Sequence, residues 1–194
     1  MRIVGGKYRN RAIVAPKGKS TRPTSDRARE NMFNVIEHAD WCPPIKGARV
    51  ADIYAGSGAL GLEAMSRGAA FCLFIEMAAE ARGAIRDNID VLQLFGHTRL
   101  HRRDATQLGD KPSNLGDPFT LVFLDPPYGF GLGPKTLSKL LEGNWVSEDA
   151  VAVLEVGADE EPVTPGWVCQ VIKEYGAAKV LFLTRDHPGM ASPD

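Results

Sequence analysis

Apolar residues in this chain recur with two spacings, which together predict an alternation of strands and helices. Short segments rich in apolar residues predict strands at residues 49–54, 71–75, 99–102, 119–124, 150–156, 169–175 and 179–184. Apolar residues at helical spacing predict helices at residues 25–39, 60–66, 78–94 and 134–141. Thr24 or Ser25 is a suitable N-cap for the first of these helices.

Strands that alternate with helices are typical of a mostly parallel sheet covered on both faces, as in an α/β Rossmann-like fold. Residues 176–178 leave only three residues between the last two strands, which suits a hairpin and not a crossover. We therefore expect seven strands, the last of them antiparallel. We expect a basic N-terminal hairpin and helix at residues 1–40, a main domain at residues 41–186, and a flexible tail at residues 187–194.

Composition places the chain among soluble globular proteins. A length of 194 residues suits one domain with a small appendage, and 44% hydrophobic with 24% charged residues is ordinary. No apolar run is long enough for a membrane span, and the first residues lack a signal-peptide core. Cys42, Cys72 and Cys169 have neither disulfide nor zinc spacing, so we interpret them as reduced core thiols. We expect a cytoplasmic monomer that holds no metal ion.

The net charge of −1 conceals an uneven distribution. Residues 1–36 contain nine basic and two acidic residues, a surplus of seven positive charges that points to a polyanion bound at this end. On one strand of a hairpin, the spacing of Arg9 and Arg11 would put both side chains on the same face. Arg22, Arg27 and Arg29 would flank the mouth of the site. The alternative is that this basic N-terminal segment, the arm, is solvated and binds no ligand.

A glycine motif follows the first predicted strand. Gly56, Gly58 and Gly61 match the G-x-G-x-x-G spacing of a nucleotide-binding turn, and Glu76 ends the next strand about 20 residues on. This signal alone fits a nicotinamide dehydrogenase as well as a methyltransferase. Asp52 favours S-adenosylmethionine, because an ionised carboxylate would repel a pyrophosphate and attract an ammonium or sulfonium. The alternative for Asp52 is a carboxylate that caps the next helix.

Two further acids suit the same ligand. The Glu76 carboxylate can accept hydrogen bonds from both ribose hydroxyls. Asp104, after the third strand, could accept from an adenine amino group, and the backbone N–H of Ala105 could reach a ring nitrogen. Since ligands of open α/β sheets bind at the carboxyl ends of the strands, these acids are expected to share one edge.

The segment DPPY at residues 125–128 ends the fourth predicted strand with an acid, two prolines and an aromatic ring. The prolines favour extended conformations, so carbonyl oxygens can point into a site. Asp125 and the Pro126 carbonyl could accept the two hydrogens of an exocyclic amine and direct its lone pair at a methyl group. Tyr128 could stack on the flipped base. The sequence therefore predicts a methyltransferase acting on an amine.

Taken together, these motifs resemble the RsmD-type family of 16S ribosomal RNA guanine-N2 methyltransferases, which have the class I S-adenosylmethionine-dependent fold. The similarity runs from IVGGKYRNR and RPTSDRARENMF through DIYAGSGALGLEAMSRGA and DPPY to EYGAAKVLFL. It implies methylation of guanine N2 in 16S ribosomal RNA, within a small-subunit assembly intermediate. It also implies that Asp125 and Tyr128 bind the base, and that the cofactor is held by Gly56, Gly58, Glu76 and Asp104. Tyr54 stands where phenylalanine is usual and is expected to border the cofactor.

Other functions stay open. DPPY is shared with adenine-N6, cytosine-N4 and glutamine-amide methyltransferases, so the motif specifies an amine and not which one. A DNA or protein methyltransferase would usually have a larger recognition region than this arm. A dehydrogenase would use the glycine turn and leave DPPY without a role. A non-catalytic RNA-binding protein would explain the charge but not the intact set of acids.

Overall fold

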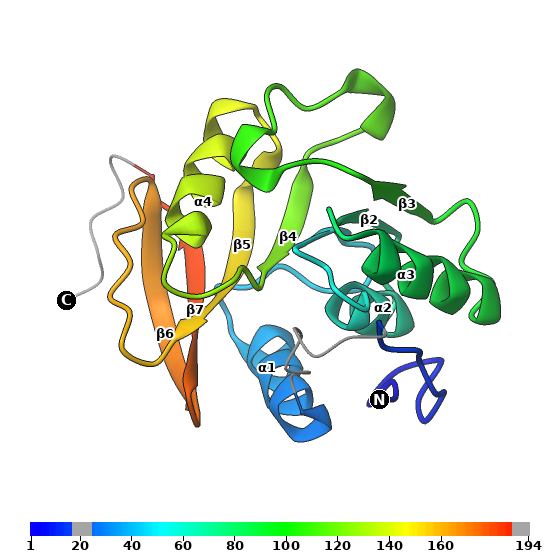
Figure 1. Cartoon of the computed structure of the whole chain (residues 1–194). Coiled ribbons are helices and arrows are strands. Elements are labelled where there is room, and N and C mark those ends of the chain that lie inside the picture. The colour runs from blue at the N-terminus through cyan, green and yellow to red at the C-terminus, as the bar shows by residue number, and fades with distance from the viewer. Residues whose placement is uncertain (17–24, 188–194) are drawn as a thin grey trace.

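A seven-stranded sheet forms the centre of the computed structural model, which describes residues 1–16 and 25–187 (Figure 1). Its strand order is β3-β2-β1-β4-β5-β7-β6. The strands are β1 (Arg49–Ile53), β2 (Phe71–Ile75), β3 (Thr98–His101), β4 (Phe119–Leu124), β5 (Val146–Gly157), β6 (Trp167–Tyr175) and β7 (Ala178–Arg185). Each predicted strand is present, with β5 beginning four residues before its predicted start.

The sheet is parallel from β3 to β5, and β7 runs antiparallel to both of its neighbours. The prediction of an antiparallel last strand is confirmed. In the sheet order, however, β7 lies between β5 and β6, so β6 and not the last strand forms the edge. The short turn between β6 and β7 explains their direct pairing, because a two-residue connection permits only an antiparallel hairpin.

Helices cover both faces of the sheet (Figure 1). One face packs against α1 (Asp26–His38), α2 (Ala59–Ser66) and α3 (Ala79–Val91), and the other against α4 (Leu132–Glu142) and the short 3-10 helices η1 (Ala105–Gln107) and η2 (Ser113–Leu115). The Ser25 hydroxyl accepts a hydrogen bond from the Ala28 N–H at 3.1 Å, so α1 begins where the sequence predicts. The α/β prediction is therefore confirmed.

The N-terminal segment packs into the first of these layers. Ile3 and Ile13 are buried in the same apolar cluster as Phe33 of α1 and Leu62 of α2. A single antiparallel bridge joins Arg2 to Ala12. The expected hairpin is thus a loop closed by one bridge, held in place by the core of the main domain.

The structure of this loop contradicts one prediction about the arm, that Arg9 and Arg11 share one face of a strand. Arg9 lies in a turn between the bridged residues and not on a strand, so the period-two argument for Arg9 and Arg11 does not apply. Both residues are nevertheless exposed. Arg22 and the rest of the segment 21–24 lie outside the described residues, as do residues 188–194 of the predicted tail.

The cysteines differ in burial. Cys72 is buried, Cys42 is half-buried and Cys169 is exposed on the edge strand β6. The interpretation of all three as core thiols is therefore wrong for Cys169, whose residue lies in a strand with one open side. All three are free thiols.

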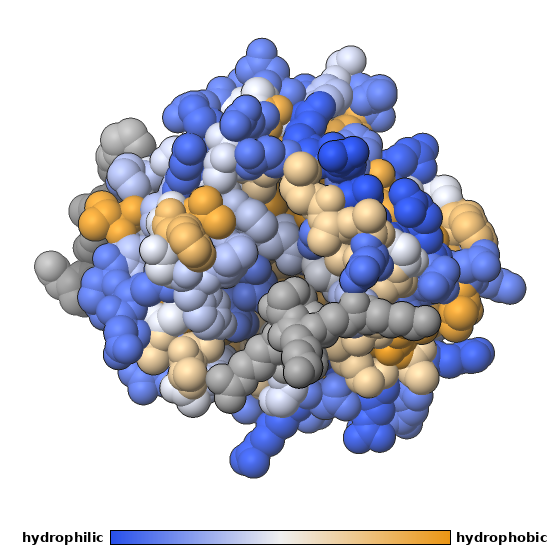
Figure 2. All heavy atoms as spheres, viewed as in Figure 1, coloured by the Kyte–Doolittle hydropathy of each residue, from blue (hydrophilic) through white to orange (hydrophobic). Residues whose placement is uncertain are grey.

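The face of the molecule shown in Figure 2 is mainly hydrophilic, with hydrophobic residues in separate small groups. Exposed large apolar side chains include Met77, Phe95 and Phe130. Within residues 1–16 and 25–187, no helix combines the length and the apolar character that a membrane crossing requires.

Candidate active site

A row of polar residues lies along the carboxyl edge of the parallel strands. Ile53 pairs with Ile75 of β2 and with Leu124 of β4, and Leu124 pairs with Leu154 of β5. The residue after each of these positions therefore stands at one level of the sheet: Glu76, Tyr54, Asp125 and Glu155. The expected convergence on one edge is present, and it includes Glu155, which the sequence analysis missed.

The glycine turn joins β1 to α2 and requires glycine for more than one reason. Gly56 has φ +56° and Gly58 has φ +77°, backbone conformations that favour glycine. A Cβ atom on Gly61 would lie 2.5 Å from the Phe74 ring and 2.6 Å from the Cys72 sulfur. Two of the glycines therefore shape the turn, and the third lets α2 pack closely on β2.

Glu76 closes this turn from the neighbouring strand. One carboxylate oxygen accepts a hydrogen bond from the Gly56 N–H at 2.9 Å, and the other accepts from the Ala78 N–H at 2.7 Å. The residue is only partly exposed. The carboxylate predicted to contact a ribose is thus fixed beside the glycine turn by two backbone donors.

The side chain of Asp52 lies at the start of α2, where the helix-capping alternative places it. The residue is 2% exposed, and its Oδ2 accepts a hydrogen bond from the Gly61 N–H at 2.8 Å, in the first turn of α2. Burial raises the pKa of Asp52 well above its usual value, and the charges of Asp125 and Glu76 act in the same direction. The observed contact is therefore the one that the helix-capping alternative predicts, and a contact of Asp52 with the cofactor stays a prediction.

Tyr54 and Asp104 border the same edge from the α4 side. The Tyr54 hydroxyl and Thr136 Oγ1 of α4 are hydrogen-bonded at 2.7 Å. Burial, together with the charge of Asp104, raises the pKa of Tyr54. Asp104 is exposed and accepts hydrogen bonds from both the N–H and the hydroxyl of Thr106, which lower its pKa. Ala105 follows it and is buried at the start of η1.

Asp125 immediately follows the last residue of β4. Its N–H donates to the Ile53 carbonyl at 3.4 Å, which extends the pairing of β4 with β1 by one residue. Burial, and then the neighbouring charge of Glu155, raise the pKa of Asp125 to about 7. A carboxylate with this pKa can accept a proton near neutral pH. Pro126 is buried behind it and Tyr128 is exposed.

Glu155 is joined to the DPPY segment by its side chain. The Tyr128 hydroxyl donates a hydrogen bond to Glu155 Oε1. Burial raises the pKa of Glu155 as it does that of Asp125. The sequence signal was a single acid inside the apolar run of residues 150–156, where a carboxylate is costly unless it has partners.

The loop after DPPY is braced against the same strand. Glu160 Oε1 accepts hydrogen bonds from the Gly129 N–H at 3.1 Å and from the Gly157 N–H at 2.9 Å. The side chain therefore ties the turn after Tyr128 to the end of β5. This brace holds the Tyr128 ring near Glu155.

Comparison with known proteins shows which family the chain resembles. The model of the family described as conserved hypothetical protein 95 matches residues 1–184. The ribosomal RNA small subunit methyltransferase D of Escherichia coli strain K12 is 34% identical over 196 aligned positions, covering 100% of this chain and 94% of that protein. The enzyme of the same name from Haemophilus influenzae is 32% identical and covers 85% of this chain and 83% of its own.

The chain belongs to this family. A solved structure agrees: the Escherichia coli protein yhhF, described as a methyltransferase, superposes with a TM-score of 0.80 at 33% identity, covering 96% of this chain and 98% of that one. The resemblance to RsmD-type methyltransferases is therefore confirmed, and with it the class I methyltransferase fold and assignment to an enzyme family.

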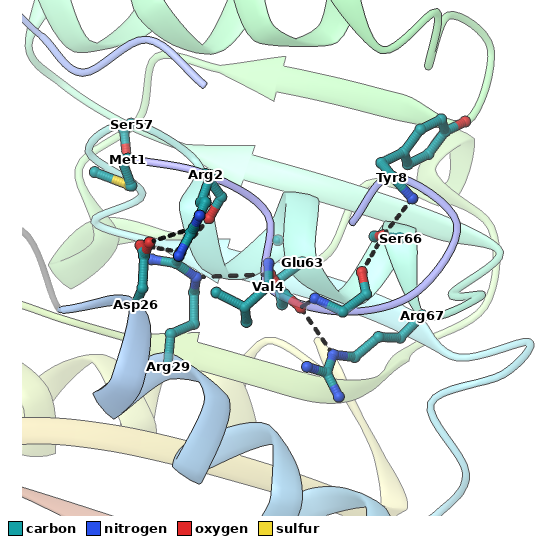
Figure 3. Close-up of polar contacts among 12 residues, drawn as sticks. Met1, Arg2, Val4, Tyr8, Asp26, Arg29, Ser57, Glu63, Ser66 and Arg67 are labelled. Carbon is teal, nitrogen blue, oxygen red and sulfur yellow. Dashed lines mark hydrogen bonds and ion pairs between the residues drawn. The ribbon is translucent and has the colours of Figure 1, made fainter. Parts of the chain in front are cut away.

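In this member of the methyltransferase family, Arg29 is not exposed as the sequence analysis predicted. Its side chain is fully buried, donates to Asp26 Oδ1 at 2.9 Å and lies 3.6 Å from Glu63 Oε2 (Figure 3). It also donates to the Arg2 carbonyl. The prediction that Arg29 contacts RNA phosphates is wrong, because its guanidinium holds the arm to α2. Arg27, two residues earlier on α1, is exposed.

Proposed function

We propose that this protein transfers a methyl group from S-adenosylmethionine to the exocyclic N2 amine of a guanine in 16S ribosomal RNA. The observation that carries the proposal is the position of Asp125, at the carboxyl end of β4 and beside a glycine turn closed by Glu76. The names of the two relatives, small subunit methyltransferases, support the choice of RNA.

The residues around the glycine turn fit the cofactor. Gly56 and Gly58 would let it approach the backbone, Glu76 would accept from the ribose, and Asp104 with the Ala105 N–H would face the adenine. The Tyr54 ring would border this space. S-adenosylmethionine supplies an electrophilic methyl group when bound. Glu76 and Asp104 both favour a cationic ligand over the pyrophosphate of a dinucleotide, which supports a methyltransferase over a dehydrogenase.

The DPPY segment would hold the amine. Asp125 and the Pro126 carbonyl would each accept one N–H of the amine, so that the nitrogen lone pair faces the methyl group. Tyr128 would stack on the flipped base, an interaction worth about 1–3 kcal/mol. Methyl transfer would form the new C–N bond and break the bond between the methyl carbon and the sulfonium sulfur, which would leave as a neutral thioether. The nitrogen would then carry a positive charge and lose a proton to Asp125, whose pKa of about 7 suits it for acceptance.

The arm would supply the contact with RNA. Arg9, Arg11 and Arg27 are exposed on the arm and on α1, and we include Arg22 on its sequence position alone. We further propose that the substrate is a small-subunit assembly intermediate and that the enzyme acts as a cytoplasmic monomer.

A methylation assay tests the proposal directly. Purified protein with labelled S-adenosylmethionine should methylate small subunits from a strain deleted for the corresponding gene, and digestion should release labelled N2-methylguanosine. Label in N6-methyladenosine would support the alternative, an adenine-N6 methyltransferase, which DPPY also permits. Label in neither nucleoside would overturn the proposal.

Replacing Glu76 with alanine should weaken S-adenosylmethionine binding. The change removes a charged acceptor, worth about 1.5–3 kcal/mol, and releases the Gly56 N–H that it now holds. Calorimetric titration should therefore show a dissociation constant raised by roughly 10- to 100-fold. Glu80→Ala, on the exposed first turn of α3, is the matched control. An unchanged constant for Glu76→Ala would remove this residue from the cofactor site.

Replacing Arg9 and Arg11 together with alanine should flatten the salt dependence of RNA binding. Each phosphate contact on single-stranded RNA contributes about −0.7 to the slope of log affinity against log salt. The slope should become less steep by roughly one unit or more. Lys139→Ala with Lys173→Ala, basic positions on α4 and β6, should leave it unchanged. Equal slopes for the arm variant and the native protein would favour the solvated-arm interpretation.

A further inference from the structure

Asp125 and Glu155 form a pair of acids at the end of two adjacent strands. Because Leu124 pairs with Leu154 in a parallel register, the next residue on each strand stands beside the other. Phe123 and Val153, two residues earlier in each strand, both belong to the cluster beneath α1, α2 and α3. Since side chains in a strand alternate between faces, Asp125 and Glu155 are directed to this same side of the sheet.

The strand spacing sets the distance between the two acids. Neighbouring strands lie about 4.7–4.9 Å apart, so two carboxylates at one level can contact adjacent atoms of one planar ring. The Tyr128 ring stands at this position too, since its hydroxyl donates to Glu155 Oε1. A base stacked on Tyr128 would therefore present one edge to both acids.

The function proposed above gives a role to Asp125 and none to Glu155. Asp125 and the Pro126 carbonyl together can accept both hydrogens of an amine, whatever ring carries it. These two contacts therefore do not distinguish guanine from adenine or cytosine. A second contact is needed, to the ring atom that neighbours the amine.

The bases differ at that neighbouring atom. In guanine, the ring nitrogen N1 beside the N2 amine carries a hydrogen and is a donor. In adenine and cytosine, the ring nitrogen on the Watson–Crick edge beside the amine carries none and is an acceptor. An ionised carboxylate only accepts hydrogen bonds, so it pairs with guanine and repels the other two.

We propose that Glu155 is the specificity-determining residue of this site, which accepts the N1–H of guanine while Asp125 accepts from the N2 amine. The proposal rests on the function proposed above and names the residue that selects guanine. Enzymes that act on flipped bases read the Watson–Crick edge through such contacts.

The electrostatics of the pair agree with this assignment. Burial and mutual repulsion raise the pKa of Asp125, and burial raises that of Glu155, so two adjacent negative charges are unfavourable in the free protein. Guanine brings donors on N1 and N2 at once and offsets the repulsion. A base with an acceptor beside its amine would add a further unfavourable contact. The reading of guanine therefore requires an acid at position 155, which the strand position alone would not.

A substrate with 2-aminopurine at the target position separates the two contacts. This base keeps the 2-amino group that Asp125 would bind, but its N1 is an acceptor. The native enzyme should methylate the guanine substrate roughly 10- to 100-fold more efficiently in kcat/KM than the 2-aminopurine substrate. The target position is identified beforehand by mapping the guanosine methylated in the small subunit.

In the Glu155→Gln variant, the ratio of kcat/KM for the guanine substrate to that for the 2-aminopurine substrate should fall by roughly tenfold or more. The reason is that an amide can donate an N–H to the N1 of 2-aminopurine. The variant keeps an oxygen that can accept from Tyr128. Glu174→Gln, on an exposed position of β6, is the matched control and should keep the native preference. Binding of S-adenosylmethionine, measured by calorimetry, should be unchanged in both variants.

The outcomes are distinct. An unchanged guanine preference in Glu155→Gln overturns the assignment of Glu155, while methylation of guanine by the native enzyme still supports the proposed function. Equal rates of the native enzyme on the two substrates overturn the assignment without any variant, so a folding defect in Glu155→Gln cannot conceal the answer. Absence of guanine-N2 methylation by the native enzyme overturns both proposals.

Discussion

Replacing Asp125 with alanine should abolish detectable methyl transfer and leave S-adenosylmethionine binding within a few-fold of the native value. The carboxylate is assigned to the target amine, as its hydrogen-bond acceptor and as the acceptor of its proton. Loss of such a group reduces turnover by roughly 100- to 10,000-fold. The measurements are single-turnover methylation of small subunits and calorimetric titration of the cofactor.

The structure also predicts that this loss is not due to unfolding. The pKa of Asp125 in the folded protein, about 7, lies well above the ordinary value of an aspartate. The side chain therefore favours the folded state only while it is protonated, and its contribution is lost as the pH rises through about 7. At pH 8 the ionised group opposes folding, so Asp125→Ala should be at least as stable there as the native protein. Near-normal turnover of this variant would contradict the assigned mechanism.

Asp149→Ala serves as the control for this experiment. Asp149 is an exposed acid on the same strand as Glu155 and accepts a hydrogen bond from the Ser147 hydroxyl at 2.6 Å. It lies far along β5 from the carboxyl edge. Its replacement should change neither turnover nor cofactor binding.

The parts of the fold that local sequence determines could be predicted. Apolar runs identified β2 and β4 to the residue, because a strand buried on both faces needs mostly apolar side chains. The glycine spacing predicted the turn after β1, since positive φ at Gly56 and Gly58 excludes most other residues. Asp125 and Glu76 followed from their places at the ends of such runs.

The parts that depend on distant partners could not be predicted. The sequence around Arg29 resembles an exposed helix face, and only the packing of α2 supplies the buried carboxylate of Glu63. Asp52 has the same local appearance whether it faces a ligand or the Gly61 N–H. Glu155 became a candidate only when the strand register put it beside Asp125.

The arm shows the same dependence on tertiary contacts. Asn88 of α3 accepts from the Val14 N–H at 2.7 Å, and its side-chain amide donates to the carbonyls of both Val14 and Ser57 at 3.0 Å. One buried side chain thus holds the end of the loop and the glycine turn together. Positive charge in the arm indicated a polyanion, but charge alone could not reveal that the arm backbone is fixed beside the glycine turn.

Glu63 is the second anchor of the arm, and its loss should strongly destabilise the protein. Its buried carboxylate accepts hydrogen bonds at 2.8 Å from the N–H groups of both Val4 and Gly5, and pairs with Arg67 at 2.9 Å (Figure 3). Arg29, on the other side, is also fully buried. Glu63→Ala would leave these donors without their shared acceptor inside the core. Removing one partner of a buried ion pair costs about 3–5 kcal/mol.

Urea unfolding of Glu63→Ala should therefore show a free energy of unfolding lower by about 3–5 kcal/mol. Glu37→Ala is the matched control, because Glu37 pairs with the same Arg67 at 2.8 Å but has a side chain that is 35% exposed. An exposed pair contributes about 0–1 kcal/mol, so this variant should unfold close to the native midpoint. Equal losses in the two variants would mean that the buried carboxylate does not hold the arm, and that apolar packing of Ile3 and Ile13 is sufficient.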